Sequence, residues 1–126
     1  MKSMTAKIVN MTAHTVNVFE NGEQVLVIEP SGEVIRLEEE RMQVSAVNGV
    51  SVYHQSYSDP KGTVPEMETG VIYLVSMKVA TNPKVLHRTD FVCPGRAIFD
   101  DDGNRLGCDG LSSAAGMLVL SGGEEE

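Results

Sequence analysis

Two Asn-Gly dipeptides, each set between short β-prone segments, constrain the fold of this chain more than any other feature. Asn21-Gly22 separates TVNVFE from EQVLVIE, and Asn48-Gly49 separates RMQVSAV from VSVYHQ. A type I′ turn needs two central residues that tolerate positive φ, and Asn followed by Gly meets this need well. Apolar and polar residues alternate on both sides, which is the period of a half-buried strand. The sequence therefore predicts two β-hairpins, centred on residues 21–22 and 48–49.

Further turn signals divide the rest of the chain into short segments. Pro30-Ser31-Gly32 and Asp59-Pro60-Lys61-Gly62 have turn compositions, and a short strand is expected over residues 33–37. The run GVIYLVSMKVATNP predicts a buried strand and then a short helix that ends before Pro83. FVCPGRAIFD and NRLGCDGL flank Asp-Asp-Gly-Asn as a last hairpin, and AGMLVL is expected to add a closing strand.

Many short strands at close spacing predict one β-rich domain. The chain has 126 residues, 41% of them hydrophobic, which is enough for an independent core. We expect a mainly β (α+β) fold over residues 1–120, a compact antiparallel barrel or sandwich of successive hairpins with one short helix. Residues 121–126, SGGEEE, are expected to form an acidic flexible tail.

The charge of the chain excludes some partners. The formal net charge is −8, with only ten Lys and Arg, so the field of the protein repels phosphate backbones and anionic lipid. Nucleic acid is therefore not expected as a partner. No apolar run resembles a signal peptide or approaches the roughly 20 residues of a membrane span, so we expect an intracellular protein with no membrane partner.

Both cysteines and three consecutive aspartates lie in one stretch, HRTDFVCPGRAIFDDDGNRLGCDG. A two-residue turn at Asp102-Gly103 would place Cys93 opposite Ser112 and Cys108 opposite Ala97. The cysteines would then share a face about 13 Å apart, beyond the roughly 7 Å Cα limit of a disulfide. No C-x-x-C or H-x-x-x-H spacing supplies zinc ligands. We predict two buried thiols, no metal site and no cofactor.

The aspartates resemble a calcium loop only in part. With Gly103 at the position of the loop's invariant glycine, Ile98 stands where the first carboxylate belongs, so the essential oxygens are incomplete. We expect a turn whose aspartate side chains accept hydrogen bonds from the adjacent backbone.

The histidines leave two functional alternatives open. With Asn21-Gly22 as the turn centre, His14 would lie opposite Glu29 on a largely apolar face, as an oriented base or ligand-binding group or as a structural histidine. His54-Gln55-Ser56 and His87-Arg88-Thr89 each form an H-x-[ST] triplet, as in phosphoesterases with paired motifs of this kind. A small phosphoesterase that uses His54 and His87 is therefore one alternative, although the regular apolar flanks of those enzymes are missing.

The arginines are the better candidates for binding a ligand. A guanidinium can hold a phosphate or carboxylate through two hydrogen bonds at once. Arg88, Asp90 and Arg96 lie beside Pro94-Gly95, which is expected to be a turn that aims them at one point. Salt bridges at the protein surface are the alternative use of these side chains.

Four segments together resemble a widespread family of small proteins in bacterial genomes and prophages. The segments are IVNMTAHTV, EPSGEVIRLE, GVIYLVS and RTDFVCPGRAIFDDDGNRLGCDGL, and the match covers most of residues 7–112. Family members carry N-[LM]-T-[PA]-H-x-[VI], P-S-G, G-[VT]-[IL]-Y-[IL]-V-S, R-x-D-[FLV] with P-G, and G-C-x-[GA]. Ala13 stands where the family more often has proline. The positions that match recurrent polar residues of the family are Asn10, Thr12, His14, Ser76, Arg88, Asp90 and Cys108.

The resemblance implies a phage or prophage protein in the cytoplasm of a bacterial host cell. The resemblance itself implies no chemistry. By analogy with compact phage proteins that hold nucleotide signals without cleaving them, we expect a non-enzymatic anti-defence protein that sequesters a small anionic or nucleotide ligand. Aromatic residues such as Tyr53, Tyr57 or Phe91 would stack on a base. The alternative is an accessory or host-takeover protein that binds a host protein through its acidic surface. A homo-oligomer is compatible with both. The predicted ligand-binding residues are Arg88, Arg96, Asp90, His14, Thr12, Asn10, Tyr53 and Ser76, with no catalytic residue among them.

Overall fold

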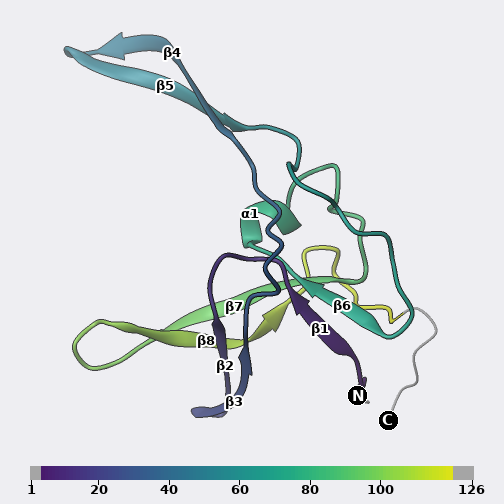
Figure 1. The fold of residues 1–126 in the computed structure, drawn as a ribbon. Helices are drawn as coiled ribbons and strands as arrows, with labels where there is room; N and C mark the ends of the chain where they lie inside the picture. Colours follow the sequence, from purple (N-terminus) through teal and green to yellow (C-terminus); the bar gives the residue numbers. More distant parts are fainter. Residues whose placement is uncertain (1–3, 121–126) are drawn as a thin grey trace.

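A computed structural model describes residues 4–120 of the chain (Figure 1). It contains short strands and one helix of a single turn. In chain order the elements are β1 (Lys7–Asn10), β2 (Val16–Glu20), β3 (Glu23–Ile28), β4 (Glu39–Val47), β5 (Val50–Tyr57), β6 (Val71–Leu74), α1 (Met77–Ala80), β7 (Phe91–Phe99) and β8 (Arg105–Ser112). The acidic tail predicted over residues 121–126 lies outside the described residues. In the described part of the chain, no helix has the length and apolar character needed to cross a membrane.

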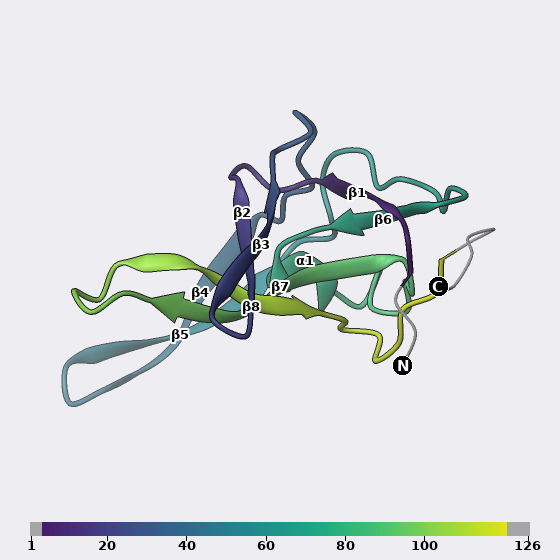
Figure 2. The ribbon, with the colours of Figure 1, turned by 90° about the horizontal axis from the view of Figure 1, so that it is seen from below.

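Six of the strands form one curled sheet in the order β1-β6-β7-β8-β2-β3, and β4 and β5 form a second sheet of their own. The hairpins β2–β3 and β7–β8 are antiparallel, whereas β1–β6, β6–β7 and β2–β8 are parallel pairs. In Figure 2, β2 and β3 pass across the β7–β8 ribbon, so the sheet curls like part of a barrel. The predicted fold class is confirmed: the protein is mainly β, built on hairpins, with one short helix. The turn signals do not predict the parallel pairs that join the hairpins.

The three predicted hairpins are present, and the two Asn-Gly turns have the expected backbone. Asn21 and Gly22 have φ values of 51° and 82°, and Asn48 and Gly49 have values of 50° and 79°. Two successive positive φ angles are the requirement of a type I′ turn, which explains the choice of Asn-Gly.

Strand β6 lies between β1 and β7 in the sheet and is buried on both faces. Val71 and Tyr73 enter an apolar cluster with Val79 and Ala80 of α1, while Ile72 and Leu74 enter a second cluster with residues of β2, β3 and β8. A strand with parallel neighbours on both sides is covered above and below, so its sequence is apolar throughout rather than alternating. The prediction of a buried strand followed by a short helix before Pro83 is confirmed.

Two expected strands are not found among the described residues. Residues 33–37 form only one isolated bridge, Arg36 to Lys61, and buried Ile35 packs in the cluster beside α1. Residues 115–120 run as irregular chain, in which Leu118 and Leu120 pack against the second cluster. Both predictions were wrong for the same reason: these apolar side chains cover existing core and do not need a ladder of their own.

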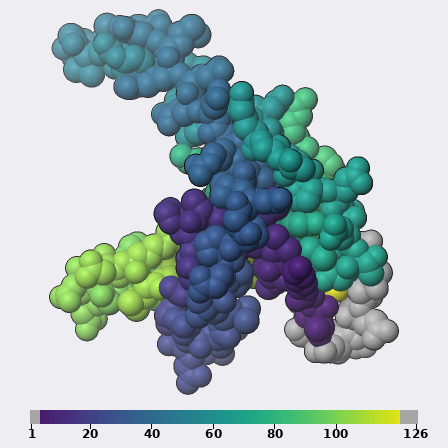
Figure 3. Space-filling model, in the orientation of Figure 1, coloured from purple at the N-terminus to yellow at the C-terminus, as the bar shows by residue number. Residues whose placement is uncertain are grey.

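The β4–β5 hairpin, residues 39–57, projects from the rest of the molecule and is called the arm below (Figures 1 and 3). The six-stranded sheet together with α1 is called the body. The Ser58 N–H donates to the Glu38 carbonyl at 2.8 Å, and the Glu38 N–H donates to the Ser58 hydroxyl oxygen at 2.9 Å, so the base of the arm is closed by hydrogen bonds.

Candidate functional site

A pocket of about 770 Å³ opens where β2, β7 and β8 meet the segment that begins α1. Its basic side chains are His14, from the loop before β2, Arg96 of β7 and Arg105 of β8. Thr12 and Ser76 add hydroxyl groups, and Val16, Met77 and Leu106 are among its apolar lining residues. The volume lies in the range that small-molecule sites occupy, roughly 300–1,000 Å³.

Two glycines let the strands around the pocket come close together. A Cβ on Gly107 would collide with the Asn17 carbonyl oxygen of β2, and one on Gly95 would collide with backbone carbonyl oxygens of Asp109 and Gly110. Only glycine therefore fits at either position. The turn predicted at Pro94-Gly95 was wrong, because both residues lie within β7 and Pro94 pairs with Leu111 of β8.

Asn10 organises the loop that carries His14 but does not itself line the pocket. Its side-chain amide donates to the carbonyls of His14 at 2.9 Å and Ile28 at 2.8 Å, and its Oδ1 accepts from the Thr12 N–H at 2.9 Å and the Thr12 hydroxyl at 2.7 Å. Asn10 is 1% exposed, and its side chain bonds to the loop at Thr12 and His14 and to the end of β3 at Ile28. Asn10 is a positioning residue for Thr12 and His14.

His14 lines the pocket, but not in the register that the sequence predicted. Val16 pairs with Ile28, and a register shift between Val18 and Phe19 moves the rest of the hairpin by one residue. The predicted pairing of His14 with Glu29 was therefore wrong, and Thr15 donates to the Glu29 carboxylate at 3.0 Å instead. In the described structure no side-chain contact of His14 with a carboxylate is found, so its imidazole is available to the pocket.

Arg88 and Asp90 form a structural ion pair outside the pocket. The Arg88 Nε and Nη2 atoms each donate to one Asp90 oxygen at 2.8 Å, and the side-chain exposures are 14% for Arg88 and 1% for Asp90. The Arg88 guanidinium also lies 4.4 Å from the centre of the Phe91 ring. The structure thus separates Arg88 and Asp90 from Arg96, because Pro94-Gly95 continues the strand instead of turning it.

Arg96 and Arg105 are the two cationic side chains of the pocket and have no carboxylate partner among residues 4–120. Arg105 donates only from Nε, to the Gly107 carbonyl at 3.4 Å. None of the described lining residues is Asp or Glu, although the chain has 18 of them against ten Lys and Arg. The pocket is therefore a positive site on an acidic protein.

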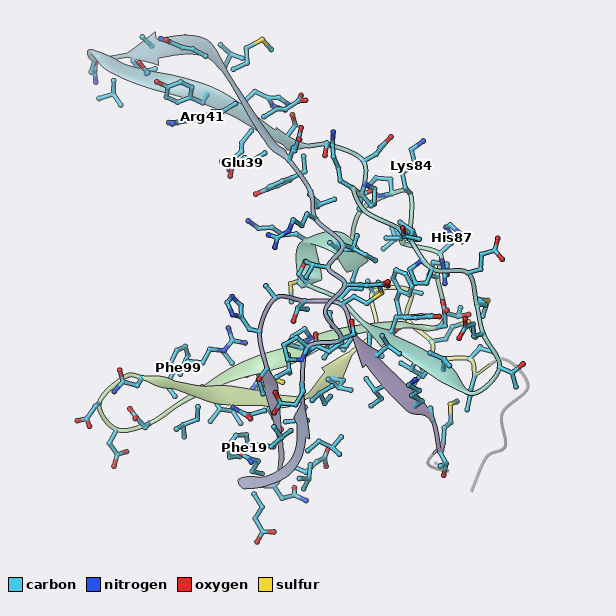
Figure 4. The ribbon with its side chains drawn as sticks, viewed as in Figure 1. Phe19, Glu39, Arg41, Lys84, His87 and Phe99 are labelled. Carbon is cyan, nitrogen blue, oxygen red and sulfur yellow. The ribbon has the colours of Figure 1, made fainter. Side chains whose placement is uncertain are left out.

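Ser76 lines the pocket and also begins α1, where its hydroxyl accepts from the Val79 N–H at 3.2 Å. Tyr53 lies elsewhere, on the arm, with its ring 3.6 Å from the Arg41 guanidinium carbon; Figure 4 labels Arg41 there. His54 is also on the arm, and Figure 4 shows His87 on the body, beyond α1 from the arm. In the described structure neither histidine lines the pocket.

The two cysteines have the predicted strand register but belong to different apolar clusters. Cys93 pairs with Ser112 and Cys108 with Ala97, and both thiols are free and buried. Cys93 packs in the cluster beside α1, and Cys108 packs in the cluster beside β2. Burial raises the pKa of the Cys93 thiol above its ordinary value of 9.0, with a smaller contribution from Cys108.

The aspartate turn has the predicted local hydrogen bonds. The Asp100 carboxylate accepts from the backbone N–H groups of Asp102 at 2.9 Å and Asn104 at 2.8 Å. Within residues 4–120, no three His, Cys, Asp or Glu side chains are grouped closely enough to hold a metal ion.

No family model, curated protein or solved structure matches this chain. The site is therefore interpreted from its own residues, and the resemblance to small bacterial and prophage proteins stays a prediction.

Arg105 is one of five arginines able to hold a phosphate, with Arg36, Arg41, Arg88 and Arg96, but it is absent from the predicted ligand-binding residues, and the structure places it in the pocket. Its side chain reaches the same pocket as Arg96 because β8 lies between β7 and β2, and β2 pairs with β8 in parallel. A parallel pair between distant segments leaves no turn signal in the sequence. The one available hint was the position of Arg105 directly after the Asp102-Gly103 turn, on the strand opposite Arg96.

Proposed function

We propose that the protein binds a small anionic ligand, carrying a phosphate or a similar group, in the pocket between β2, β7, β8 and α1, and does not alter it chemically. The observation that carries the proposal is the pair Arg96 and Arg105, two cations with no carboxylate partner among residues 4–120, in a pocket whose described lining has no acidic residue.

The net negative charge of the protein explains why these two arginines are informative. Solvent-exposed arginines on an acidic protein have many carboxylates available to them, so two arginines of one pocket that have no carboxylate partner in the described part of the chain are available to an external anion. His14 and the hydroxyl of Thr12 add polar groups on the facing loop, and buried Asn10 holds that loop in place. Preorganisation of this kind lowers the entropy that binding must offset.

The apolar side of the pocket bears on the rest of the ligand. Val16, Met77 and Leu106 line the pocket beside its polar groups. A ligand with an anionic group and a less polar body, as in a nucleotide, matches this division. The candidates for base stacking, Tyr53 and Phe91, are on the arm and in the core, so a base would be held by aliphatic contacts.

Sequestration without catalysis fits the available groups better than phosphoester hydrolysis. The phosphoesterase alternative needs His54 and His87 at one phosphate, and neither is among the described residues of the pocket. The anti-defence role would make the ligand a nucleotide immune signal in a bacterial cell. That role rests on the analogy with compact phage proteins that hold such signals and is part of the proposal.

The experiment is to incubate the purified protein with a panel of cyclic and linear nucleotides, remove unbound compound, denature the protein by heat and identify what is released by mass spectrometry. We expect a retained nucleotide to be recovered intact. The double variant Arg96→Gln/Arg105→Gln should lose retention by more than about tenfold, since a charged hydrogen bond contributes roughly 1.5–3 kcal/mol.

The matched control is Arg36→Gln/Arg41→Gln, which removes two arginines outside the pocket and should retain the ligand as the wild type does. Recovery of a cleaved nucleotide would favour the phosphoesterase. No retained compound from any class of anion would contradict the proposal and favour the protein-binding alternative.

A further inference from the structure

The arm is unusual because its strands are exposed along almost their whole length. Every residue of β4 and all but one of β5 are exposed, and the two strands pair only with each other. Figure 3 shows the arm standing clear of the rest of the surface. An isolated two-stranded hairpin is marginally stable in water, because it buries too little apolar area to offset the entropy of ordering it.

The strand register gives the two faces of the arm different chemistry. The pairs Met42–His54, Ser45–Val52 and Val47–Val50 fall on one face, and Gln43–Tyr53 and Arg41–Gln55 fall on the other. We call the first the apolar arm face, defined by Met42, Val47, Val50 and Val52. These four side chains are 64%, 58%, 66% and 40% exposed.

The opposite face is already occupied by contacts within the chain. The Arg41 guanidinium lies over the Tyr53 ring, and the Lys78 ammonium of α1 lies 4.9 Å from the centre of the Tyr57 ring. Gln55 donates to the Glu39 carboxylate on the same face. The apolar arm face has no comparable cover among the described residues, and four large aliphatic side chains in a row mark an interaction surface.

Charge decides which partner fits this face. Residues 42–53 contain no Asp, Glu, Lys or Arg, in a chain that is 22% charged and has a net charge of −8. Two copies of so acidic a molecule repel each other over most of their surface, but they can bring neutral segments together without that cost. A partner recognised by charge would instead be drawn to the carboxylates outside this segment.

We propose that two copies of the chain form a dimer by packing their apolar arm faces against each other. In a two-fold symmetric dimer, the apolar arm face of one copy packs against the same face of the other. The valines of the two copies would then be in contact, with Met42 at the edge of the interface. The two hairpins then enclose a small apolar layer, as two packed sheets do. A second copy of the chain is present wherever the chain is made. It can therefore bury the apolar arm face at all times. The proposal is independent of the ligand pocket.

The test is sedimentation velocity of the full chain over a series of concentrations at neutral pH. The wild type should approach twice its monomer mass of 13.6 kDa and shift toward 13.6 kDa on dilution. Val50→Glu places a charge within the proposed interface, near the tip of the arm, and should weaken association by more than about tenfold. Val50→Thr keeps the branched shape and strand propensity, and should weaken it less.

Ser51→Glu is the matched control, because Ser51 is adjacent in sequence but lies on the opposite face of the arm. It adds the same charge and should leave the dimer unchanged, and circular dichroism should show the same β spectrum for all four proteins. A wild type that is monomeric at every concentration would overturn the proposal and leave the face to a different protein. A dimer equally insensitive to Val50→Glu and Val50→Thr would overturn it too, because another surface would then hold the copies together.

Discussion

Strand β6 and the arm are made of similar β-prone sequence but occupy opposite environments. All four residues of β6 are buried, whereas the valines of the arm are 40–66% exposed. The difference shows that valine-rich strands can be stabilised in two ways in one chain. The body supplies its own cover through two apolar clusters, and the arm depends on its tight turn, its cross-strand pairs and, as we propose, a second copy.

The strongest way to test this contrast is to compare a charged contact of the body with one of the arm. Asp90→Ala leaves the Arg88 guanidinium without its partner at a site where Asp90 is 1% exposed, and should lower the free energy of unfolding by about 3–5 kcal/mol. Arg41→Ala removes only the exposed contact with Tyr53 and should cost about 0.5–1 kcal/mol. Urea unfolding measures both. Equal losses would break the contrast.

An apolar pair of substitutions gives the next largest difference. Leu74 is fully buried, so Leu74→Ala should lower the free energy of unfolding by about 2–5 kcal/mol through lost contacts and a residual cavity. Val44 is 57% exposed in the arm, and Val44→Ala should change it by less than about 0.5 kcal/mol. Thermal unfolding followed by circular dichroism distinguishes them, and a large loss for Val44→Ala would show that the arm is part of the core.

A smaller loss of stability is expected for Asn10, which supports the loop at the edge of the pocket. Asn10→Ala removes three hydrogen bonds to the loop that carries Thr12 and His14 and one to Ile28 of β3, and should cost about 1–3 kcal/mol of stability. It should also weaken ligand retention while Arg96 and Arg105 are intact. The same retention assay used for the arginine variants measures this. Unchanged retention would remove the positioning role of Asn10.

The smallest expected effect is a loss of stability at alkaline pH. It comes from two buried groups of the body, Cys93 and Tyr73. The pKa of Cys93 is raised from 9.0 by burial, and the pKa of Tyr73 is raised from 10.0 by burial and by the Glu68 and Asp90 carboxylates. The folded chain therefore keeps these protons to a higher pH than the unfolded chain does. Their contribution to stability is complete below the unfolded pKa values and is lost as pH rises through the folded ones.

We expect the free energy of unfolding, measured with urea, to decline from about pH 9 upward. Cys93→Ala should flatten part of this decline, although the variant is less stable at neutral pH because it loses core packing. A stability that rises over the same interval would contradict the assignment of these shifts.

The sequence predicts those features of the fold that depend on neighbours along the chain. The Asn-Gly turns, the buried run of β6 with its short helix, and the Cys93–Ser112 and Cys108–Ala97 pairs are all confirmed. The β2–β3 register was missed because a shift between Val18 and Phe19 inserts one residue, and this alone moves His14 away from Glu29. A bulge of this kind leaves little trace in a pattern of alternating residues.

The candidate site was harder to predict because it depends on contacts between distant segments. Thr12, His14, Ser76 and Arg96 do come together, but the sequence grouped Arg96 with Arg88 and Asp90 through the turn expected at Pro94-Gly95. The parallel pairing of β2 with β8 is what brings Arg105 into the pocket. Such pairing is set by the packing of the whole sheet and not by local preference.

The most direct test of the central claim is an NMR titration of the uniformly ¹⁵N-labelled protein with inorganic pyrophosphate, observing the arginine Nε–Hε signals. The signals of Arg96 and Arg105 should shift and saturate together at one equivalent of pyrophosphate, while that of Arg88, held by Asp90, stays in place. Small, unsaturated shifts spread over Arg36, Arg41, Arg96 and Arg105 alike, or no shift at all, would contradict the claim that the two unpaired arginines form an anion-binding site.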